Sequence, residues 1–282
     1  MSGPSGVGAR SYLYVPGDRP DRIEKALASG ADAVVVDLED AVAVAAKDEA
    51  RGHAAATVAL PPTDGTEVWV RINQGRRGSD DLDAVCAGRG LTGVFLPKAS
   101  NHTVASAALV LGDRMAVALV ESAAALVELD DLAGRPKLAA LAMGEVDLAA
   151  DLGIEPSPDG AELWPVRLRA VVASAAAGLR PPIGPVWVAV RDLDGLEAST
   201  VQLRRRGFGA RQAIHPTQVP VINAAFTPTE EAVERARQLL DGADASEAGA
   251  WVGPDGSMVD EAVLRSARRT LGLAERWGSR RG

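Results

Sequence analysis

The chain has 282 residues, of which 47% are hydrophobic and 24% are charged, so it can bury a substantial core. This composition excludes the disordered and fibrous classes of protein. The 38 acidic residues outnumber the 30 basic residues and give a formal net charge of −8. Such a surface field disfavours binding to the phosphate backbone of a nucleic acid.

The single cysteine, Cys86, can form neither an internal disulfide nor a cysteine metal cage, and we interpret it as a helix residue without chemistry. This cysteine usage favours a reducing compartment. No apolar run approaches the roughly 20 residues that a membrane span requires. Residues 1–9 are small and glycine-rich without the apolar stretch of a secretory signal, so we expect a flexible N-terminus and a cytoplasmic protein.

Short apolar or β-branched runs alternate along the chain with longer, alanine-rich amphipathic stretches. The runs are 11–15, 33–36, 68–72, 93–96, 115–120, 138–143, 186–190 and 212–214. The segments between them are long enough for the crossover helices that parallel strands require. Eight such βα units predict a closed (β/α)8 TIM barrel, a fold of about 250 residues that here would occupy residues 10–227.

Residues 228–282 remain beyond the predicted barrel. Their sequence predicts a helix over 230–240, a small polar linker over 241–250, a glycine-containing loop or short hairpin over 251–260, and a helix over 261–277. Because this segment is too small to fold alone, we expect a C-terminal arm that packs either on the barrel or on a neighbouring subunit.

Polar side chains follow most of the predicted strands, at the end where barrel enzymes carry their active sites. They are Asp37, Glu39 and Asp40, then Arg71 and Asn73, Lys98, Glu121, Glu145 and Asp147, and His215. Any one of them alone is equally well explained as a helix cap or a loop residue. Their presence after six of the eight runs is harder to explain by capping alone.

Glu121 and Asp147 are expected at the ends of adjacent strands, about one strand spacing apart and facing the same barrel mouth. Two carboxylates without a neighbouring cysteine or histidine suit a hard cation that keeps several waters, which favours Mg²⁺ over Zn²⁺. The alternative is that Asp147 only caps the helix that begins at this residue.

Arg71 ends the third run, and a permanently charged guanidinium at a barrel mouth normally faces a carboxylate or an oxyanion. The structural alternative is an ion pair with Asp37, Glu39 or Asp40. Both roles are compatible with one another.

Two other strand-end residues, Lys98 and His215, carry groups that can react. Lys98 is a candidate for a Schiff base, as in some barrel aldolases, but the pair of carboxylates favours the metal route. His215 has no nucleophile near it in the sequence and is interpreted as a packed, hydrogen-bonded histidine.

A set of motifs occurs in order from residue 10 to the C-terminal segment. They are RSYLYVPG (10–17), ADAVVVDLEDAV (31–42), VRIN (70–73), LPK (96–98), VES (120–122), GEVDL (144–148), IHPTQ (214–218) and NAAFTP (223–228). Together they resemble the citrate lyase β-subunit-like group of the HpcH/HpaI aldolase superfamily, which includes malyl-CoA and citramalyl-CoA lyases. The resemblance runs to about residue 271 and rests on the ordered set, not on any single motif.

The resemblance implies a (β/α)8 barrel that uses Mg²⁺ to make or break a carbon–carbon bond between an acyl-CoA enolate and a 2-oxo acid. By resemblance, Glu121 and Asp147 match the metal ligands, and Arg71 matches the arginine that binds the carbonyl oxygen. Glu121 and Lys98 are counted with Arg71 as substrate-binding residues. Asp40 lies where related aldolases place a basic histidine.

The motif GSMVD (256–260) resembles the family's C-terminal cap, whose aspartate, here Asp260, reaches the active site of an adjacent subunit. The resemblance therefore implies a homotrimer or hexamer in which the arm covers a neighbouring site. Asp260 is then the first candidate for the general acid that protonates the enolate, and Asp40 is the second.

The expected reaction is the cleavage of a 3-hydroxyacyl-CoA, such as citramalyl-CoA or malyl-CoA, into an acyl-CoA and a 2-oxo acid, or the reverse condensation. The alternatives are a malyl-CoA thioesterase or malate-synthase-like activity, a citrate lyase β-subunit that acts on an acyl-carrier thioester, and a barrel that binds CoA esters without catalysis. One departure from the family pattern bears on this choice. Gly184 and Ala189 stand near the seventh predicted strand where acidic residues are expected.

Overall fold

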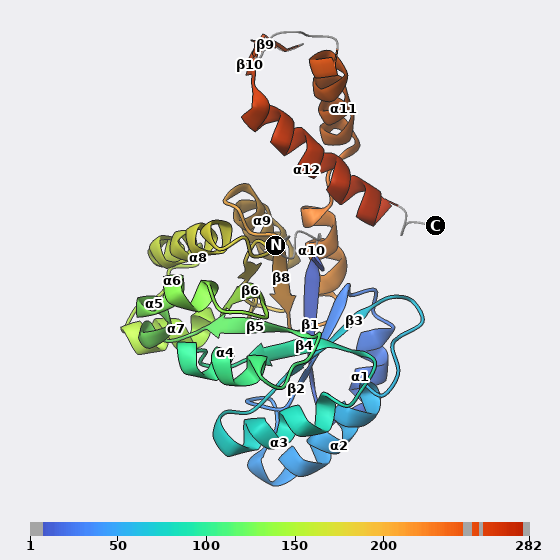
Figure 1. The fold of residues 1–282 in the computed structure, drawn as a ribbon, viewed down its shortest axis with the longest axis vertical. Helices are drawn as coiled ribbons and strands as arrows, with labels where there is room; N and C mark the ends of the chain where they lie inside the picture. Colours follow the sequence, from blue (N-terminus) through green and yellow to red (C-terminus); the bar gives the residue numbers. More distant parts are fainter. Residues whose placement is uncertain (1–7, 245–249, 254–255, 279–282) are drawn as a thin grey trace. The chain divides into compact units, whose positions relative to one another are not determined.

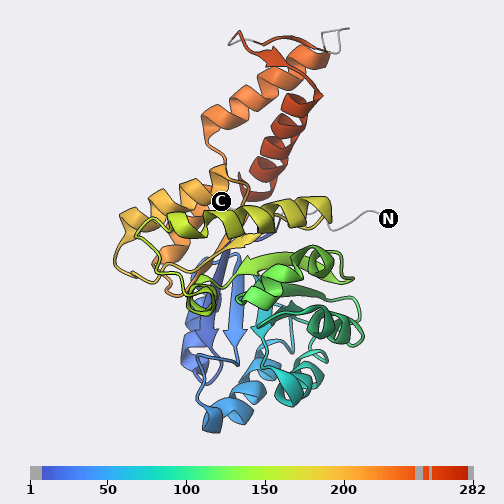
Figure 2. The same ribbon diagram turned by 90° about the vertical axis from the view of Figure 1, so that its left-hand side faces the viewer.

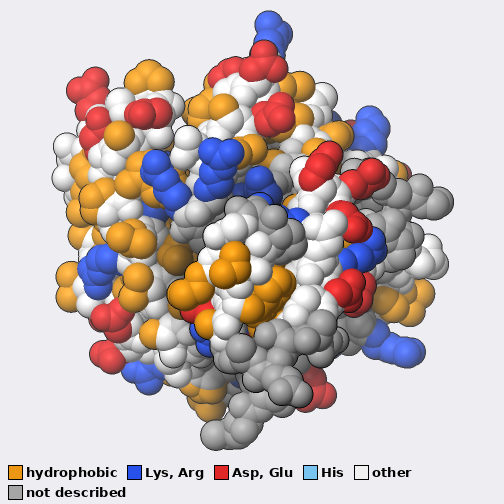
Figure 3. Space-filling view, turned by 90° about the horizontal axis from the view of Figure 1, so that it is seen from above, with side chains coloured by type: hydrophobic (Ala, Val, Ile, Leu, Met, Phe, Trp, Pro, Cys, Tyr) orange, Lys and Arg blue, Asp and Glu red, His pale blue; other side chains and the backbone are white. Residues whose placement is uncertain are grey.

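The structure of the chain is a computed structural model that describes residues 8–244, 250–253 and 256–278. The chain divides into two compact units, Met1–Ala224 and Ala225–Gly282. Among the described residues, no helix combines the length and the apolar character needed to cross a membrane. Acidic, basic and hydrophobic side chains are interspersed on the face drawn in Figure 3.

Eight parallel strands of the first unit close into a barrel, because β1 pairs with both β2 and β8. The strands are β1 (Ser11–Pro16), β2 (Ala33–Asp37), β3 (Glu67–Arg71), β4 (Leu91–Leu96), β5 (Met115–Val120), β6 (Leu138–Met143), β7 (Ile183–Gly184) and β8 (Ala210–Ala213). The (β/α)8 TIM barrel predicted from the sequence is therefore confirmed, and seven of its strands overlap the predicted runs.

Helices surround the strands of the barrel (Figures 1 and 2). They are α1 (Pro20–Leu27), α2 (Lys47–Thr57), α3 (Gly75–Val85), α4 (Asn101–Ala108), α5 (Ala123–Val127), α6 (Leu129–Ala133), α7 (Glu145–Leu152), α8 (Trp164–Ala176), α9 (Leu193–Arg205) and α10 (Gln218–Phe226), with short 3₁₀ turns at Val44–Ala46 and Ala161–Leu163. Because they cover the outer face, strands such as β2 are buried on both sides, and three consecutive valines replace an alternating pattern in its centre.

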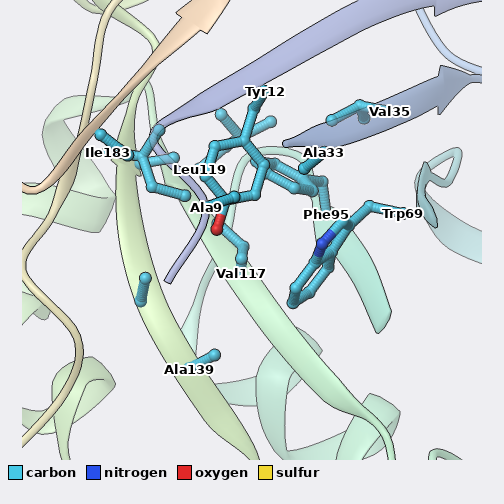
Figure 4. Close-up of a cluster of buried hydrophobic side chains, with 13 residues drawn as sticks. Ala9, Tyr12, Ala33, Val35, Trp69, Phe95, Val117, Leu119, Ala139 and Ile183 are labelled. Atoms are coloured by element: carbon cyan, nitrogen blue, oxygen red, sulfur yellow. The ribbon is translucent and has the colours of Figure 1, made fainter. Parts of the chain in front are cut away.

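A cluster of buried aliphatic and aromatic side chains fills the barrel interior (Figure 4). The rings of Tyr12, Trp69 and Phe95 meet edge to face, with centroids 5.7–6.2 Å apart, and each side chain is at most 2% exposed. Such contacts contribute about 0.5–1.5 kcal/mol each beyond the burial of apolar area. The barrel centre is thus a packed core, which leaves the mouth at the carboxyl ends of the strands for chemistry.

The prediction that the seventh strand spans residues 186–190 is wrong. The structure places β7 at Ile183–Gly184, and the run that follows is irregular, with Val188 68% exposed. Prolines at 181, 182 and 185 flank the true strand and remove ladder donors, so β7 is limited to two residues. A Cβ atom at Gly184 would lie 2.7 Å from Cδ1 of Leu203 in α9, so a side chain there would require Leu203 to shift.

The second unit contains α11 (Glu230–Asp244), α12 (Glu261–Gly278) and the antiparallel hairpin β9 (Trp251–Val252) and β10 (Met258–Val259). The predicted helices and hairpin are present, and α11 continues four residues beyond its predicted end at residue 240. The hydrophobic core of this second unit comprises Ala236, Leu239, Val259 and Ala267. The rest of the predicted linker, 245–249, lies outside the described residues.

The predicted flexible N-terminus, 1–9, falls almost entirely outside the described residues, which begin at residue 8. Ala9 is 2% exposed and belongs to the buried cluster of the barrel. Flexibility therefore stays a prediction for residues 1–7 and does not extend to Ala9.

Candidate active site

A cavity of about 460 Å³ opens at the carboxyl ends of the barrel strands. Its charged and polar lining includes Asp37, Asp40, Arg71, Glu121, Asp147 and Gln212. Four of the six residues selected from the sequence, Asp40, Arg71, Glu121 and Asp147, therefore lie around one cavity. The other two, Lys98 and Asp260, are not part of this lining.

Glu121 directly follows β5 and is 4% exposed. One of its carboxylate oxygens, Oε1, accepts a hydrogen bond of 2.5 Å from the backbone N–H of Lys98. Gly144 lies against the same side chain, because a Cβ atom there would come within 2.8 Å of Oε2. Burial raises the pKa of Glu121 above its usual range, and the charge of Asp147 adds to this rise.

Asp147 lies in the first turn of α7 and is exposed to the cavity. Within the part of the chain that the structure describes, its carboxylate has no hydrogen-bond or ion-pair partner. The N-cap of α7 is Gly144, and no side chain caps this helix. The alternative that Asp147 only caps the helix is therefore wrong. An unpaired carboxylate next to the buried Glu121 leaves an excess of negative charge that suits a cation.

Three carboxylates surround the guanidinium of Arg71. Asp37 accepts two hydrogen bonds from it, 2.7 Å from Nε and 2.6 Å from Nη2. Nη1 lies 3.0 Å from Glu39 and 3.6 Å from Asp40. Burial alone would lower the pKa of Arg71, but hydrogen bonds and charge from Asp37 raise it overall, so the guanidinium stays charged. The structural ion pair considered from the sequence is present, and Arg71 also lines the cavity.

The loop after β2 is folded around the carboxylate of Asp37. Its two oxygens accept hydrogen bonds from the backbone N–H groups of Glu39, at 2.9 Å, and Ala41, at 3.2 Å. This turn buries the side chain of Glu39, whose pKa is raised to about 7, chiefly by burial and further by the charges of Asp40 and Glu121. Arg71 opposes this rise.

Sequence reasoning missed two residues at the floor of the cavity, Tyr14 and Gln212. The hydroxyl of Tyr14 donates to Oε1 of Gln212 at 2.9 Å, and the Gln212 amide donates to the backbone oxygens of Met143 and Gly184 at 2.9 and 3.0 Å. These bonds connect β1, β6, β7 and β8 across the barrel. Neither residue stands out in the sequence, because both lie inside strands rather than after them.

Glu145, the other acidic residue of the GEVDL motif, has a structural partner. Its carboxylate accepts two hydrogen bonds of 2.6 Å from Arg167 of α8, and both side chains are buried. Both carboxylate oxygens of Glu145 are therefore occupied by Arg167, whereas those of Asp147 are available to a ligand.

Lys98 lines a second cavity of about 400 Å³, together with His102 and other residues of α3 and α4. Its backbone has a φ of 43°, which is uncommon for a residue with a side chain, and this conformation directs its N–H toward Glu121. The contribution of Lys98 to the main cavity is thus a backbone donor, which does not support a Schiff base there.

His215 is exposed, so its interpretation as a packed histidine is wrong, although its Nδ1 lies 2.8 Å from Oγ1 of Thr217. The helix after β8 begins only at Gln218, which leaves this residue in a surface turn. Cys86 follows α3 and is half-buried, and burial raises the pKa of its thiol.

Asp260 belongs to the second unit and precedes α12. Its Oδ1 accepts hydrogen bonds from the backbone N–H groups of Ala262 and Val263, at 2.9 and 3.1 Å. It is therefore an N-cap residue, and its catalytic role stays a prediction.

Among the described residues, no group of three or more histidine, cysteine, aspartate or glutamate side chains is arranged to hold a metal ion. A cation at Glu121 and Asp147 would therefore have two protein ligands and take its other ligands from water or substrate. Mg²⁺ is commonly bound in this way in proteins.

Comparison with known proteins identifies the family. The model of the HpcH/HpaI aldolase/citrate lyase family matches residues 10–216. A citrate lyase subunit beta-like protein of Mycobacterium tuberculosis is 37% identical over 267 residues, which cover 92% of this chain and 93% of that protein. A (3S)-malyl-CoA thioesterase of Cereibacter sphaeroides is 33% identical over 271 residues, covering 94% of each chain.

Among solved structures, the protein CitE of Mycobacterium tuberculosis, crystallised with magnesium, acetoacetate and coenzyme A, superposes with a TM-score of 0.80 at 34% identity. The match covers 95% of this chain and 98% of that chain. The fold, the ordered motifs and these similarities agree, and the chain belongs to the HpcH/HpaI aldolase/citrate lyase family.

Proposed function

We propose that this protein is a Mg²⁺-dependent carbon–carbon lyase that cleaves or forms a 3-hydroxyacyl-CoA, such as citramalyl-CoA or malyl-CoA. The products of cleavage are an acyl-CoA and a 2-oxo acid. The observation that carries the proposal is the convergence of Glu121, Asp147 and Arg71 on one cavity at the barrel mouth. A related protein of known structure binds magnesium, acetoacetate and coenzyme A, which supports the same ligand classes here.

The chemistry of the residues present fits Mg²⁺. Glu121 and the unpaired Asp147 offer hard oxygen ligands at the ends of adjacent strands, and no protein cation neutralises Asp147 among the described residues. When bound there, Mg²⁺ supplies a Lewis acid that polarises an oxygen of the 2-oxo or 2-hydroxy acid part of the substrate. The backbone N–H of Lys98 fixes one oxygen of Glu121 and leaves the other for a ligand.

Arg71 stabilises the substrate oxygen whose charge changes as the carbon–carbon bond breaks. Its guanidinium is held by Asp37 through Nε and Nη2, so its orientation is set before substrate binds. The acyl-CoA enolate released by cleavage must gain a proton. Asp260 of a neighbouring subunit in a trimer or hexamer is the first candidate for the donor, and Asp40, which lines the cavity, is the second.

The test is a panel of malyl-CoA, citramalyl-CoA and related thioesters assayed with Mg²⁺ and then with a chelator. We expect an acyl-CoA and a 2-oxo acid as products, and loss of turnover with the chelator. Glu121→Gln and Asp147→Asn should each lower kcat by about 100-fold or more, whereas the exposed surface variant Asp130→Asn should not. Turnover that is indifferent to the chelator would overturn the proposal.

A second candidate, malyl-CoA hydrolysis, is favoured by one observation, the 33% identity to a (3S)-malyl-CoA thioesterase. Product analysis separates the two candidates. Free CoA with an intact hydroxy acid indicates hydrolysis of the thioester, whereas an acyl-CoA with a 2-oxo acid indicates lyase action.

A further inference from the structure

Lys47, at the first position of α2, is a buried lysine outside the cavity lining. The residue is only 8% exposed, and its ammonium group makes three hydrogen bonds. It donates to the backbone oxygens of Leu38 at 2.8 Å and Glu39 at 2.7 Å, and to Oδ1 of Asn73 at 2.6 Å. All three ammonium donors are therefore used, as the burial of a charge requires.

The three acceptors lie at the ends of two neighbouring strands. Leu38 and Glu39 follow β2, and Asn73 follows β3 two residues after Arg71. Backbone carbonyls of consecutive residues seldom face one cation unless the chain turns there, so Lys47 stabilises the turn between Asp37 and Asp40. One ammonium thus ties the loop after β2 to the loop after β3.

Asn73 is itself held from the other side. Its backbone N–H and its amide both donate to Oδ2 of the fully buried Asp81, at 2.8 and 2.7 Å, and Nε of Arg51 donates to Oδ1 of Asp81 at 2.7 Å. Lys47 occupies the end of this network next to the cavity, and the partly exposed Arg51 occupies the outer end.

The turn that Lys47 stabilises carries the carboxylates that orient Arg71. Asp37 binds two nitrogens of Arg71, and Glu39 lies 3.0 Å from the third. Without the ammonium, the backbone oxygen of Leu38 and Oδ1 of Asn73 would have no donor among the described residues, at a cost of roughly 1–3 kcal/mol for each buried unsatisfied group. The backbone oxygen of Glu39 would keep only its 3.2 Å hydrogen bond from the N–H of Val42. The turn would relax to satisfy these oxygens, and the carboxylates would move with it.

We propose that Lys47 is a positioning residue for Arg71, acting through the loop that carries Asp37 and Glu39 and not by contact with substrate. This inference rests on the proposed lyase function for its kinetic consequence, but its structural consequence is independent of any activity. A displacement of about 1 Å in a group that acts on the transition state can cost up to about 100-fold in rate.

The experiment compares Lys47→Met, which keeps an unbranched side chain that is one atom shorter and removes its donors, with Arg51→Met on the same helix. For Lys47→Met we expect kcat to fall about 10- to 100-fold with KM for the thioester changed less than about threefold, because Arg71 acts mainly on the transition state. Arg51→Met should lower Tm but keep kcat within about threefold of the parent. If Lys47→Met does not fold, Lys47→Gln, which keeps an amide donor, replaces it.

Amide hydrogen exchange of the metal-free proteins provides the readout that does not depend on activity. In the parent, the backbone N–H groups of Leu38, Glu39 and Ala41 are bonded to Arg71 or Asp37. We expect their exchange to accelerate about tenfold or more in Lys47→Met, with no change in β5 and β6, and to stay as in the parent in Arg51→Met. The positioning role would be overturned if amide exchange were unchanged in both lysine variants. It would also be overturned if Arg51→Met lost as much kcat and as much protection from exchange as Lys47→Met. A parent without lyase activity would instead contradict the proposed function and leave the exchange result to decide the role of Lys47.

Discussion

Arg71 and Asp37 are in register at the ends of β3 and β2, and their side chains are joined by two hydrogen bonds of 2.7 and 2.6 Å. Two parallel hydrogen bonds fix the plane of the guanidinium, whereas a single hydrogen bond would let the guanidinium rotate about it. Nη1, the remaining nitrogen, faces Glu39 and Asp40. Arg71 is thus oriented by Asp37, while two further carboxylates lie beside Nη1.

Asp37→Asn tests this orientation. The amide keeps the shape of the side chain but loses one acceptor and the negative charge, so the buried guanidinium loses its closest ion-pair partner. We expect the free energy of unfolding, measured with urea, to fall by about 3 kcal/mol, and kcat to fall about 10- to 100-fold. Asp21→Asn is the matched control, because the Asp21–Arg19 pair is exposed to solvent and such pairs contribute little to stability. Parent-like stability of Asp37→Asn would contradict a buried structural ion pair.

Glu39 predicts a pH dependence of stability in the metal-free protein. Its pKa is raised to about 7 in the folded chain, whereas an unfolded glutamate titrates near its ordinary value of 4.5. Between these values the folded state binds more protons than the unfolded state, so stability is highest below pH 4.5 with respect to this group and is lost as pH rises to 7.

We expect Glu39→Gln, which cannot titrate, to remove this contribution. The difference in unfolding free energy between variant and parent should shift in favour of the variant by about 1–3 kcal/mol from pH 5 to pH 8. Urea unfolding at a series of pH values measures it. A difference that does not vary with pH would show that Glu39 is ionised throughout this range.

Much of the barrel follows from the sequence, because strands covered on both faces are short, continuous apolar runs such as MAVALV in β5 and LAALAM in β6. The runs that became β5 and β6 have the predicted bounds, and the residues after them, Glu121 and Asp147, line one cavity. The seventh strand could not be predicted in this way. The run at 186–190 is more apolar and longer than Ile183–Gly184, and it is the pairing of Ile183 with Ala142 of β6 and Ala210 of β8 that shows which segment belongs to the barrel.

The positions that orient the site are the least visible in the sequence. Lys47 begins a helix and has the pattern of a solvent-exposed residue, but its partner Asn73 lies 26 residues away. Likewise, nothing local distinguishes Glu145, which is paired with Arg167, from Asp147, which has no partner among the described residues. Burial and pairing depend on contacts between distant segments, which a pattern of neighbouring residues does not contain.

Gly144→Ala tests whether the position of Glu121 matters for the metal. The backbone of Gly144 has a φ of −98°, which any residue adopts, so the substitution acts only through its Cβ atom. That atom would lie 2.6 Å from Cβ and 2.8 Å from Oε2 of Glu121, and the carboxylate must move. We expect the Mg²⁺ concentration for half-maximal activity to rise about 10- to 100-fold, comparable to the loss of a group that supports a metal ligand. In the control Gly134→Ala the new atom meets nothing closer than 3.6 Å, and its Mg²⁺ requirement should equal that of the parent.

Asp260 combines two possible roles that three substitutions separate. As the N-cap of α12 it accepts hydrogen bonds from Ala262 and Val263, a role that serine or asparagine also fills. As a general acid it requires a carboxyl group, which neither supplies. We expect Asp260→Asn and Asp260→Ser to keep the parent's Tm and Asp260→Ala to lose about 1 kcal/mol of stability. If Asp260 protonates the enolate, all three variants should lose about 100- to 10,000-fold in kcat. Loss of activity only in Asp260→Ala would assign the residue to capping, and the proton donor would then be sought at Asp40.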